Sequence, residues 1–228
     1  MNNKAVVLLS GGLDSTTVLA YACNKNFEIY AISFDYGQKN KYELEKSAII
    51  AKEYQVKEHK KVKIDLSIFS GSSLTSDIEV EKNRSLEDIG EGIPLTYVPA
   101  RNTIFLAYAL GLADSISATD IFIGVNAVDT SGYPDCRPEF IKAFQNLANL
   151  ATRVGVENKD KIKIHAPLQN LNKAEIIKLG LSLNVNYSLT NTCYDPSPEG
   201  IACGTCDACI LRKNGFAEVG IKDPIEYI

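Results

Sequence analysis

Short apolar runs alternate along the chain with segments whose apolar residues recur at helical spacing. The runs predict strands at residues 5–9, 28–34, 60–66, 120–125 and 162–165. Helices are expected between and after them, at residues 16–22, 42–54, 101–118, from Phe140 onward, and 172–183. Strands that alternate with helices favour an α/β fold with a doubly wound parallel sheet, which binds its ligands at the carboxyl ends of the strands.

Two of these helices carry more specific signals. The apolar face expected for the first consists of Phe140, Phe144, Leu147, Ala148 and Ala151, with Pro138 in its first turn. The second begins with Asn172 followed three residues later by Glu175, the spacing of a capping box.

Residues 67–92 break the alternation, because they are rich in Ser, Glu and Gly and have weak periodicity. Loops of this length are uncommon unless they are lids or disordered segments. We expect this segment to be mobile without ligands and to close when they bind. The alternative is a surface insertion without a role.

Composition narrows the class of protein. The chain has 228 residues, 45% hydrophobic and 23% charged, with a net charge of −4, which argues against a broad nucleic-acid surface. No apolar run approaches the roughly 20 residues of a membrane span. Residues 1–9 are too short for the apolar core of a secretory signal, so we expect a cytoplasmic protein that binds no membrane. Its six cysteines are then expected to be thiols or metal ligands rather than disulfides.

The most informative motif is the run Ser10, Gly11, Gly12, Leu13, Asp14, Ser15, between an expected strand and an expected helix. Paired glycines let a ligand approach backbone N–H groups, and the helix dipole adds positive charge there. The run lacks the lysine of a Walker A loop and the spacing of a dinucleotide fingerprint. It resembles the PP-loop of the ATP pyrophosphatase superfamily, which binds the pyrophosphate end of ATP. An ordinary capped Gly-Gly turn is the plainer alternative.

A second motif, near the carboxyl end, contains four cysteines: Cys193, Cys203, Cys206 and Cys209. Two-residue spacers let successive thiolates converge on one ion, and four thiolates suit Zn²⁺ in a closed structural site. An iron–sulfur cluster or redox chemistry stays open. We expect Cys23 to be a buried small hydrophobe and Cys136 a bystander thiol.

Further candidates follow the expected strands. Gln38 or Lys39 would face nucleotide after the second strand, and Arg101, which opens the long helix, would pair with phosphate or carboxylate. The polar loop 124–138 carries Asp129 and Asp135 to read a guanine-like edge, Tyr133 to stack on a flat ring, and Arg137 to hold an anion. Ordinary turn and surface roles are the alternative for each of them. His59 and His165 receive no role.

Together these segments resemble one family, the 7-cyano-7-deazaguanine synthases (QueC family). The matching segments are residues 10–15, 36–38, 98–102, 124–140 and the four cysteines, and the stretch from Ser131 to Pro138 is the most specific of them. The chain departs from the family at Asn40, where members often carry His.

The resemblance implies an adenine nucleotide alpha hydrolase-like domain, residues 1–185, and a small C-terminal zinc-binding region, residues 186–228. It implies an ATP-dependent ligase of the queuosine and archaeosine pathways that converts 7-carboxy-7-deazaguanine and ammonia to the nitrile through an adenylate and an amide. The family's ATP site corresponds to Leu8, Leu9, Ser10, Gly11, Gly12, Leu13, Asp14, Ser15 and Gln38.

The catalytic roles follow from the same chemistry. Asp14 would help to hold Mg²⁺, and Arg101, Arg137 or Lys173 would neutralise phosphate or carboxylate charge. No direct contact with nucleic acid is expected, and a homodimer is left open. Two other functions remain: a PP-loop tRNA sulfur transferase, or a zinc-ribbon binding module without catalysis.

Overall fold

The computed structural model describes residues 3–89, 92–126, 132–157 and 161–228. Five parallel strands form one sheet in the order β3-β2-β1-β4-β5. The strands are β1 (Lys4–Leu8), β2 (Glu28–Asp35), β3 (Glu58–Lys63), β4 (Asp120–Phe122) and β5 (Lys163–His165). The strand order reverses beside β1, so the loop that follows β1 lies where a doubly wound sheet opens for a ligand.

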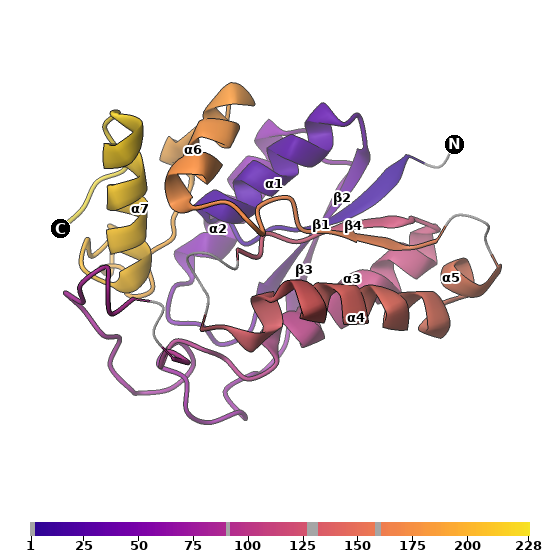
Figure 1. Cartoon of the computed structure of the whole chain (residues 1–228), viewed down its shortest axis with the longest axis horizontal. Coiled ribbons are helices and arrows are strands. Elements are labelled where there is room, and N and C mark those ends of the chain that lie inside the picture. The colour runs from indigo at the N-terminus through magenta and orange to yellow at the C-terminus, as the bar shows by residue number, and fades with distance from the viewer. Residues whose placement is uncertain (1–2, 90–91, 127–131, 158–160) are drawn as a thin grey trace.

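Helices cover both faces of the sheet (Figure 1). Those described are α1 (Leu13–Asn24), α2 (Tyr42–Glu53), α3 (Arg101–Ile116), α4 (Pro138–Ala151), α5 (Arg153–Glu157), α6 (Lys173–Ser182) and α7 (Asp207–Val219). Single 3-10 turns span Pro134–Cys136 and Tyr187–Leu189. In the view of Figure 1, α1 and α6 lie above the sheet, α3 and α4 below it, and α7 at the end near the C-terminus.

Alternate residues of the central strand supply two separate cores. Ala5 and Val7 pack with apolar residues of α1 and α6, whereas Val6 and Leu8 pack with those of α3 and α4. A strand buried on both faces reads as a continuous apolar run, which explains why residues 5–9 were recognisable from sequence.

The expected parallel α/β sheet is confirmed, and several boundaries differ. Helix α1 begins at Leu13, three residues before the expected start, because Gly12 adopts the extended backbone of an N-cap. The apolar face expected for α4 is wrong in part: Ile141, Phe144 and Ala148 are buried, but Leu147 is 51% exposed. Ala151 at the end of α4 is exposed as well. The capping box at the start of α6 is confirmed.

The long segment after β3 lies against the C-terminal cysteines. Val80 packs with them, and the Asn83 N–H donates to the Thr205 carbonyl at 2.8 Å. Arg84 forms an ion pair with Asp207 at 3.0 Å. These contacts anchor the segment near residues 80–84. The closing movement expected for residues 67–92 stays a prediction, and such a movement would have to occur on either side of this anchor.

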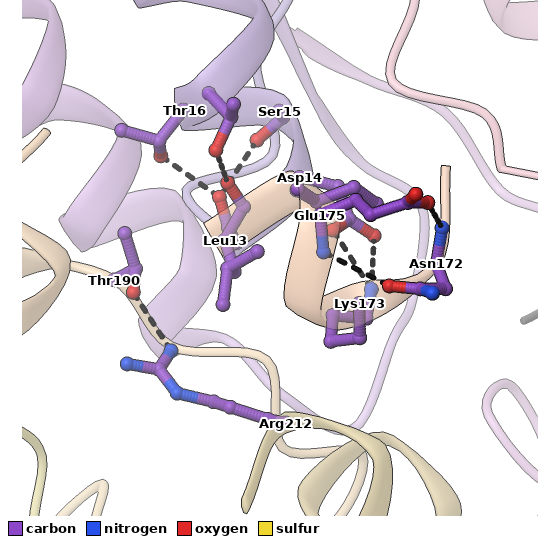
Figure 2. Close-up of polar contacts among 12 residues, drawn as sticks. Leu13, Asp14, Ser15, Thr16, Asn172, Lys173, Glu175, Thr190 and Arg212 are labelled. Atoms are coloured by element: carbon purple, nitrogen blue, oxygen red, sulfur yellow. Dashed lines mark hydrogen bonds and ion pairs between the residues drawn. The ribbon is translucent and has the colours of Figure 1, made fainter. Parts of the chain in front are cut away.

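A buried arginine joins α7 to the rest of the fold. The Arg212 side chain is 1% exposed and donates through Nε and Nη2 to the two Asp223 oxygens, at 2.8 and 2.9 Å. It also donates to Thr190 Oγ1 at 2.7 Å (Figure 2) and to the Tyr187 carbonyl at 3.1 Å. Four of the five N–H donors of the guanidinium are therefore used, which offsets the cost of burying this cation.

Candidate functional site

The loop that connects β1 to α1 is braced by its own serines. Ser15 Oγ accepts the Ser10 N–H at 3.1 Å and lies 2.9 Å from Ser10 Oγ, which in turn accepts the Gly12 N–H at 3.2 Å. Gly12 forms the N-cap of α1 without a side-chain cap. The first turn of α1 thus presents its backbone N–H groups and the positive end of its dipole without an intrahelical or side-chain acceptor, which suits an anion.

Gly11 is required where this loop meets α2. Its φ is +91°, and a Cβ built there would stand 2.3 Å from the carbonyl oxygen of Glu43 and 2.7 Å from the Ser47 nitrogen. No side chain fits at such a distance, so the glycine allows the loop backbone to pack directly on the first turns of α2. The loop and that helix turn therefore form one wall of the site.

Asp14 and Lys173 face each other at the start of α1 and α6. Lys173 Nζ donates to both carboxylate oxygens of Asp14, at 2.8 and 2.9 Å, and Figure 2 shows the two side chains meeting. The sequence expected both residues in the site, and the structure brings them together. The pair leaves a cation beside the helix N-terminus and a carboxylate whose charge is balanced.

A cavity opens beside this loop and continues across the carboxyl ends of β1, β2 and β4. Its lining includes Leu8, Leu9, Ser10, Gly12, Leu13, Asp14, Ser15, Gln38, Arg101, Tyr133 and Lys173, all expected from sequence. It also includes Phe34, Tyr36, Glu43, Phe105, Cys193 and Tyr194. The cavity therefore joins an anion-binding end to a region rich in aromatic rings.

Arg101 stands among these rings. Its guanidinium carbon lies 6.0 Å from the centre of the Tyr36 ring, within range of a cation–π interaction. Burial disfavours the charged form, but Tyr36, Tyr133 and Asp135 outweigh it and raise the pKa of Arg101 above its usual range. The site thus keeps a permanent cation in a largely apolar wall, where attraction to an anion is strong.

The candidate substrate-binding residues in the loop before α4 differ in where they lie relative to the cavity. Tyr133 is buried against the cavity, and its hydroxyl lies 2.5 Å from Thr96 Oγ1. Asp135 is also buried, but its carboxylate accepts the Asn102 N–H at 2.9 Å in the first turn of α3. Arg137 is exposed and does not line the cavity. Asp129 lies outside the described residues.

Two polar residues after β2 are engaged with the protein itself. The Gln38 amide accepts the Tyr36 N–H at 2.8 Å and donates to the Phe34 carbonyl at 3.1 Å, which fixes the turn beside the cavity. Asn40, where relatives of the resembled family often carry His, donates to the Cys193 carbonyl at 2.7 Å. Asn40 therefore ties this turn to the segment that bears the first cysteine.

The four cysteines of the C-terminal motif meet in space. Their sulfur atoms all lie within 4.8 Å of one another, and all four residues are buried. Backbone N–H groups point at the sulfurs: those of Asp195 and Cys203 at Cys193, at 3.4 and 3.2 Å, and that of Cys206 at Cys203, at 3.3 Å. Four soft donors with N–H support fit a thiolate-bound metal such as Zn²⁺ and leave no open coordination position.

Glu43 is a cavity residue that the sequence analysis did not identify. It is the second residue of α2, where a carboxylate usually serves the helix dipole. In the structure it lines the cavity beside residues 10–15, which we call the anion-binding loop. Burial raises its pKa to about 8, and the opposing attraction of Arg101 only limits this effect. No local motif distinguishes it, because its surroundings come from the packing of α2 on Gly11.

No helix within the described residues is long and apolar enough to cross a membrane.

Comparisons with known proteins agree on one family. The sequence model of the family described as "Queuosine biosynthesis protein QueC" matches residues 4–220. A 7-cyano-7-deazaguanine synthase of Desulfatibacillum aliphaticivorans is 59% identical over 225 residues, which are 99% of this chain and 97% of that protein. One from Geobacter sulfurreducens is 59% identical over 100% of this chain and 94% of that protein.

Among solved structures, an NMN synthetase from Francisella tularensis shares the fold. Its TM-score is 0.52 at 18% sequence identity, and the match covers 96% of this chain and 78% of that one. At this identity the likeness concerns the fold alone.

Proposed function

The chain belongs to the QueC family, and from that premise we propose that it makes 7-cyano-7-deazaguanine as an ATP-dependent carbon–nitrogen ligase. Its substrates are 7-carboxy-7-deazaguanine and ammonia, and the reaction runs through an adenylated intermediate and an amide. The product is a precursor in queuosine biosynthesis. Identity of 59% over almost the entire chain is the observation that carries this proposal.

The site supports the chemistry. A carboxylate is a poor electrophile, because the group that would leave is an oxide. One carboxylate oxygen attacks the α-phosphorus of ATP, the bond from that phosphorus to pyrophosphate breaks, and pyrophosphate leaves. The attacking oxygen is then part of AMP, which leaves readily when ammonia attacks the acyl carbon. A second adenylation, on the amide oxygen, lets that oxygen leave with AMP and gives the nitrile. The loop of residues 10–15 would hold the pyrophosphate end of ATP through the backbone N–H groups in the first turn of α1 and through its serine hydroxyls.

ATP and metal binding belong to this function, and we assign the individual groups as follows. Asp14 would help to hold Mg²⁺, with Lys173 moving from the carboxylate toward phosphate oxygens. Mg²⁺ supplies neutralising charge to the phosphates. Cys193, Cys203, Cys206 and Cys209 would hold structural Zn²⁺ in a C-terminal region of residues 186–228, beside the ATP-binding domain of residues 1–185.

The substrate would occupy the aromatic part of the cavity. Arg101 would pair with its carboxylate or with the adenylate phosphate, and Tyr133 would face its flat ring. Asp135 would act indirectly, since its carboxylate holds the start of α3 from which Arg101 projects. Asp129 and Arg137 stay candidates for contacts made once the substrate is bound.

The test is to incubate the protein with 7-carboxy-7-deazaguanine, ATP, Mg²⁺ and ammonium, and to identify the products by mass spectrometry. We expect the amide first and then the nitrile, each dependent on ATP. Transfer of sulfur to tRNA under matched conditions, with no amide or nitrile, would favour the sulfur transferase instead. ATP-independent behaviour in both assays would favour a binding module.

A further inference from the structure

One cavity group is not used by the roles assigned above. Glu43 faces the cavity from the first turn of α2, next to the anion-binding loop and within the electrostatic reach of Arg101. In the described part of the chain its carboxylate has neither a hydrogen bond nor an ion pair. Glu43 is half-buried in the wall of the cavity, and withdrawing a carboxylate from water without a donor is costly, so its retention here suggests a partner that arrives with the reaction.

The position of this carboxylate is fixed by backbone packing. The carbonyl of Glu43 lies where a Cβ on Gly11 would be, so the side chain projects from a turn that touches the anion-binding loop. Two titratable groups interact electrostatically with the Glu43 carboxylate: Arg101 from α3, and Tyr36, which follows the end of β2. Arg101 and the loop are the two features expected to hold the phosphate and carboxylate of an acyl-adenylate, and Glu43 lines the same cavity as both.

The reaction needs a proton acceptor at this place. Ammonia exists in neutral solution mainly as ammonium, which has no lone pair to attack a carbon. Only a small fraction is free ammonia, so a base beside the acyl carbon would let bound ammonium react. No other carboxylate lines the cavity among the described residues except Asp14, and Lys173 already neutralises that one.

We propose that Glu43 is the catalytic base that takes the proton from ammonium in the cavity, an inference that rests on the proposed function. The Glu43 carboxylate accepts one proton and ammonia is formed. The nitrogen lone pair then forms a bond to the acyl carbon, the bond from that carbon to the adenylate oxygen breaks, and AMP leaves with the electron pair. The nitrogen gives one further proton to a water molecule in the open cavity, and Glu43 releases its own proton to bulk solvent, which restores the carboxylate.

Burial of Glu43 also suits this role. An ordinary carboxylate is far too weak a base toward ammonium, whereas a carboxyl with a pKa near the working pH transfers protons efficiently in both directions. With a pKa of about 8, roughly a tenth of Glu43 is ionised at pH 7, and that fraction rises with pH.

The experiment compares two nucleophiles in Glu43→Gln. Hydroxylamine is neutral at pH 7 and converts an acyl-adenylate to a hydroxamate without prior deprotonation. We expect Glu43→Gln to lose amide formation from ammonium by about 100-fold or more. The hydroxamate rate and substrate-dependent exchange of pyrophosphate into ATP should stay close to those of the wild type. Glu43→Asp should retain part of the ammonium reaction, because it keeps a carboxylate.

Glu45→Gln is the matched control, since Glu45 lies in the same helix turn but is exposed and outside the cavity lining. Equal ammonium rates in the two glutamine variants would overturn the inference. So would an equal loss with both nucleophiles, because that would place Glu43 in adenylation or in folding. If the wild-type protein makes neither amide nor hydroxamate from 7-carboxy-7-deazaguanine, the proposed function itself fails.

Discussion

Glu43→Gln should change the pH dependence of stability in a direction that is fixed by burial alone. In the folded protein burial raises the pKa of Glu43 from 4.5 to about 8. Between pH 4.5 and about pH 8, therefore, Glu43 keeps its proton in the folded state but has lost it in the unfolded state. The free energy of unfolding of the wild type must then fall as pH rises through this window, and level off above it. Glutamine stays neutral and removes this contribution.

The size of this change in the free energy of unfolding follows from the pKa shift of Glu43. A difference of about 3.5 pKa units at about 1.4 kcal/mol per unit sets an upper limit of about 5 kcal/mol. Part of the effect is already present at pH 5 and water in the open cavity reduces the rest, so we expect the stability of Glu43→Gln relative to the wild type to rise by about 1.4 to 4 kcal/mol between pH 5 and pH 9. The variant should be the more stable protein at pH 9.

Urea unfolding followed by far-ultraviolet circular dichroism measures this difference, since the chain has no tryptophan to serve as a fluorescent probe. Other groups that titrate, the cysteines included, contribute to both proteins and cancel in the comparison. Glu45→Gln should show no such change, because Glu45 is exposed. Parallel curves for Glu43→Gln and the wild type across the pH range would refute the view that Glu43 is a desolvated carboxyl.

Three further predictions concern the anion-binding loop, the buried arginine and the metal ligands. Asp14→Ala should abolish ATP-dependent product formation with an unchanged circular dichroism spectrum, and near-normal turnover would remove its assigned role. Arg212→Met should cost about 3 to 5 kcal/mol in urea unfolding, because Asp223 is left buried without its cation, and replacing both residues by apolar ones should recover much of the loss. Cys206→Ala should lose the metal, measured by elemental analysis, and should speed amide hydrogen exchange at residues 80–84; unchanged exchange would contradict the anchoring of that segment.

The sequence was sufficient for features whose determinants are local. Continuous apolar runs identified β1 and β2, since strands buried on both faces need no alternation. The third strand was displaced, because β3 is an edge strand with mostly exposed residues and a weak pattern. The exposure of Leu147 could not be read from spacing, since helical periodicity shows which residues share a face but not where the neighbouring element ends.

The residues of the candidate site likewise fall into those that a local motif identifies and those whose surroundings depend on the fold. The anion-binding loop and the four cysteines were visible because each motif lies within a short stretch and its spacing is tied to its chemistry. Glu43 gave no signal, because a glutamate in the first turn of a helix is ordinary until the fold buries it. Asp135 shows another limit of sequence reasoning, since an acidic residue in a polar loop looks the same whether it faces a ligand or, as its bond to the Asn102 N–H shows, holds the start of a helix.

The placement of the cysteine cluster explains how a closed metal site can serve a reaction in which it takes no chemical part. The segment that enters the cluster first passes the anion-binding loop, where the Asn191 N–H donates to the Gly11 carbonyl at 3.1 Å. Two residues later comes Cys193, whose carbonyl accepts from Asn40, and both Cys193 and Tyr194 line the cavity. A bound metal would hold this short segment at Cys193, while the Gly11 carbonyl holds it at Asn191, and together they would fix one wall of the cavity. Loss of the metal should accordingly weaken ATP binding through the loop backbone, although no cysteine needs to touch the nucleotide.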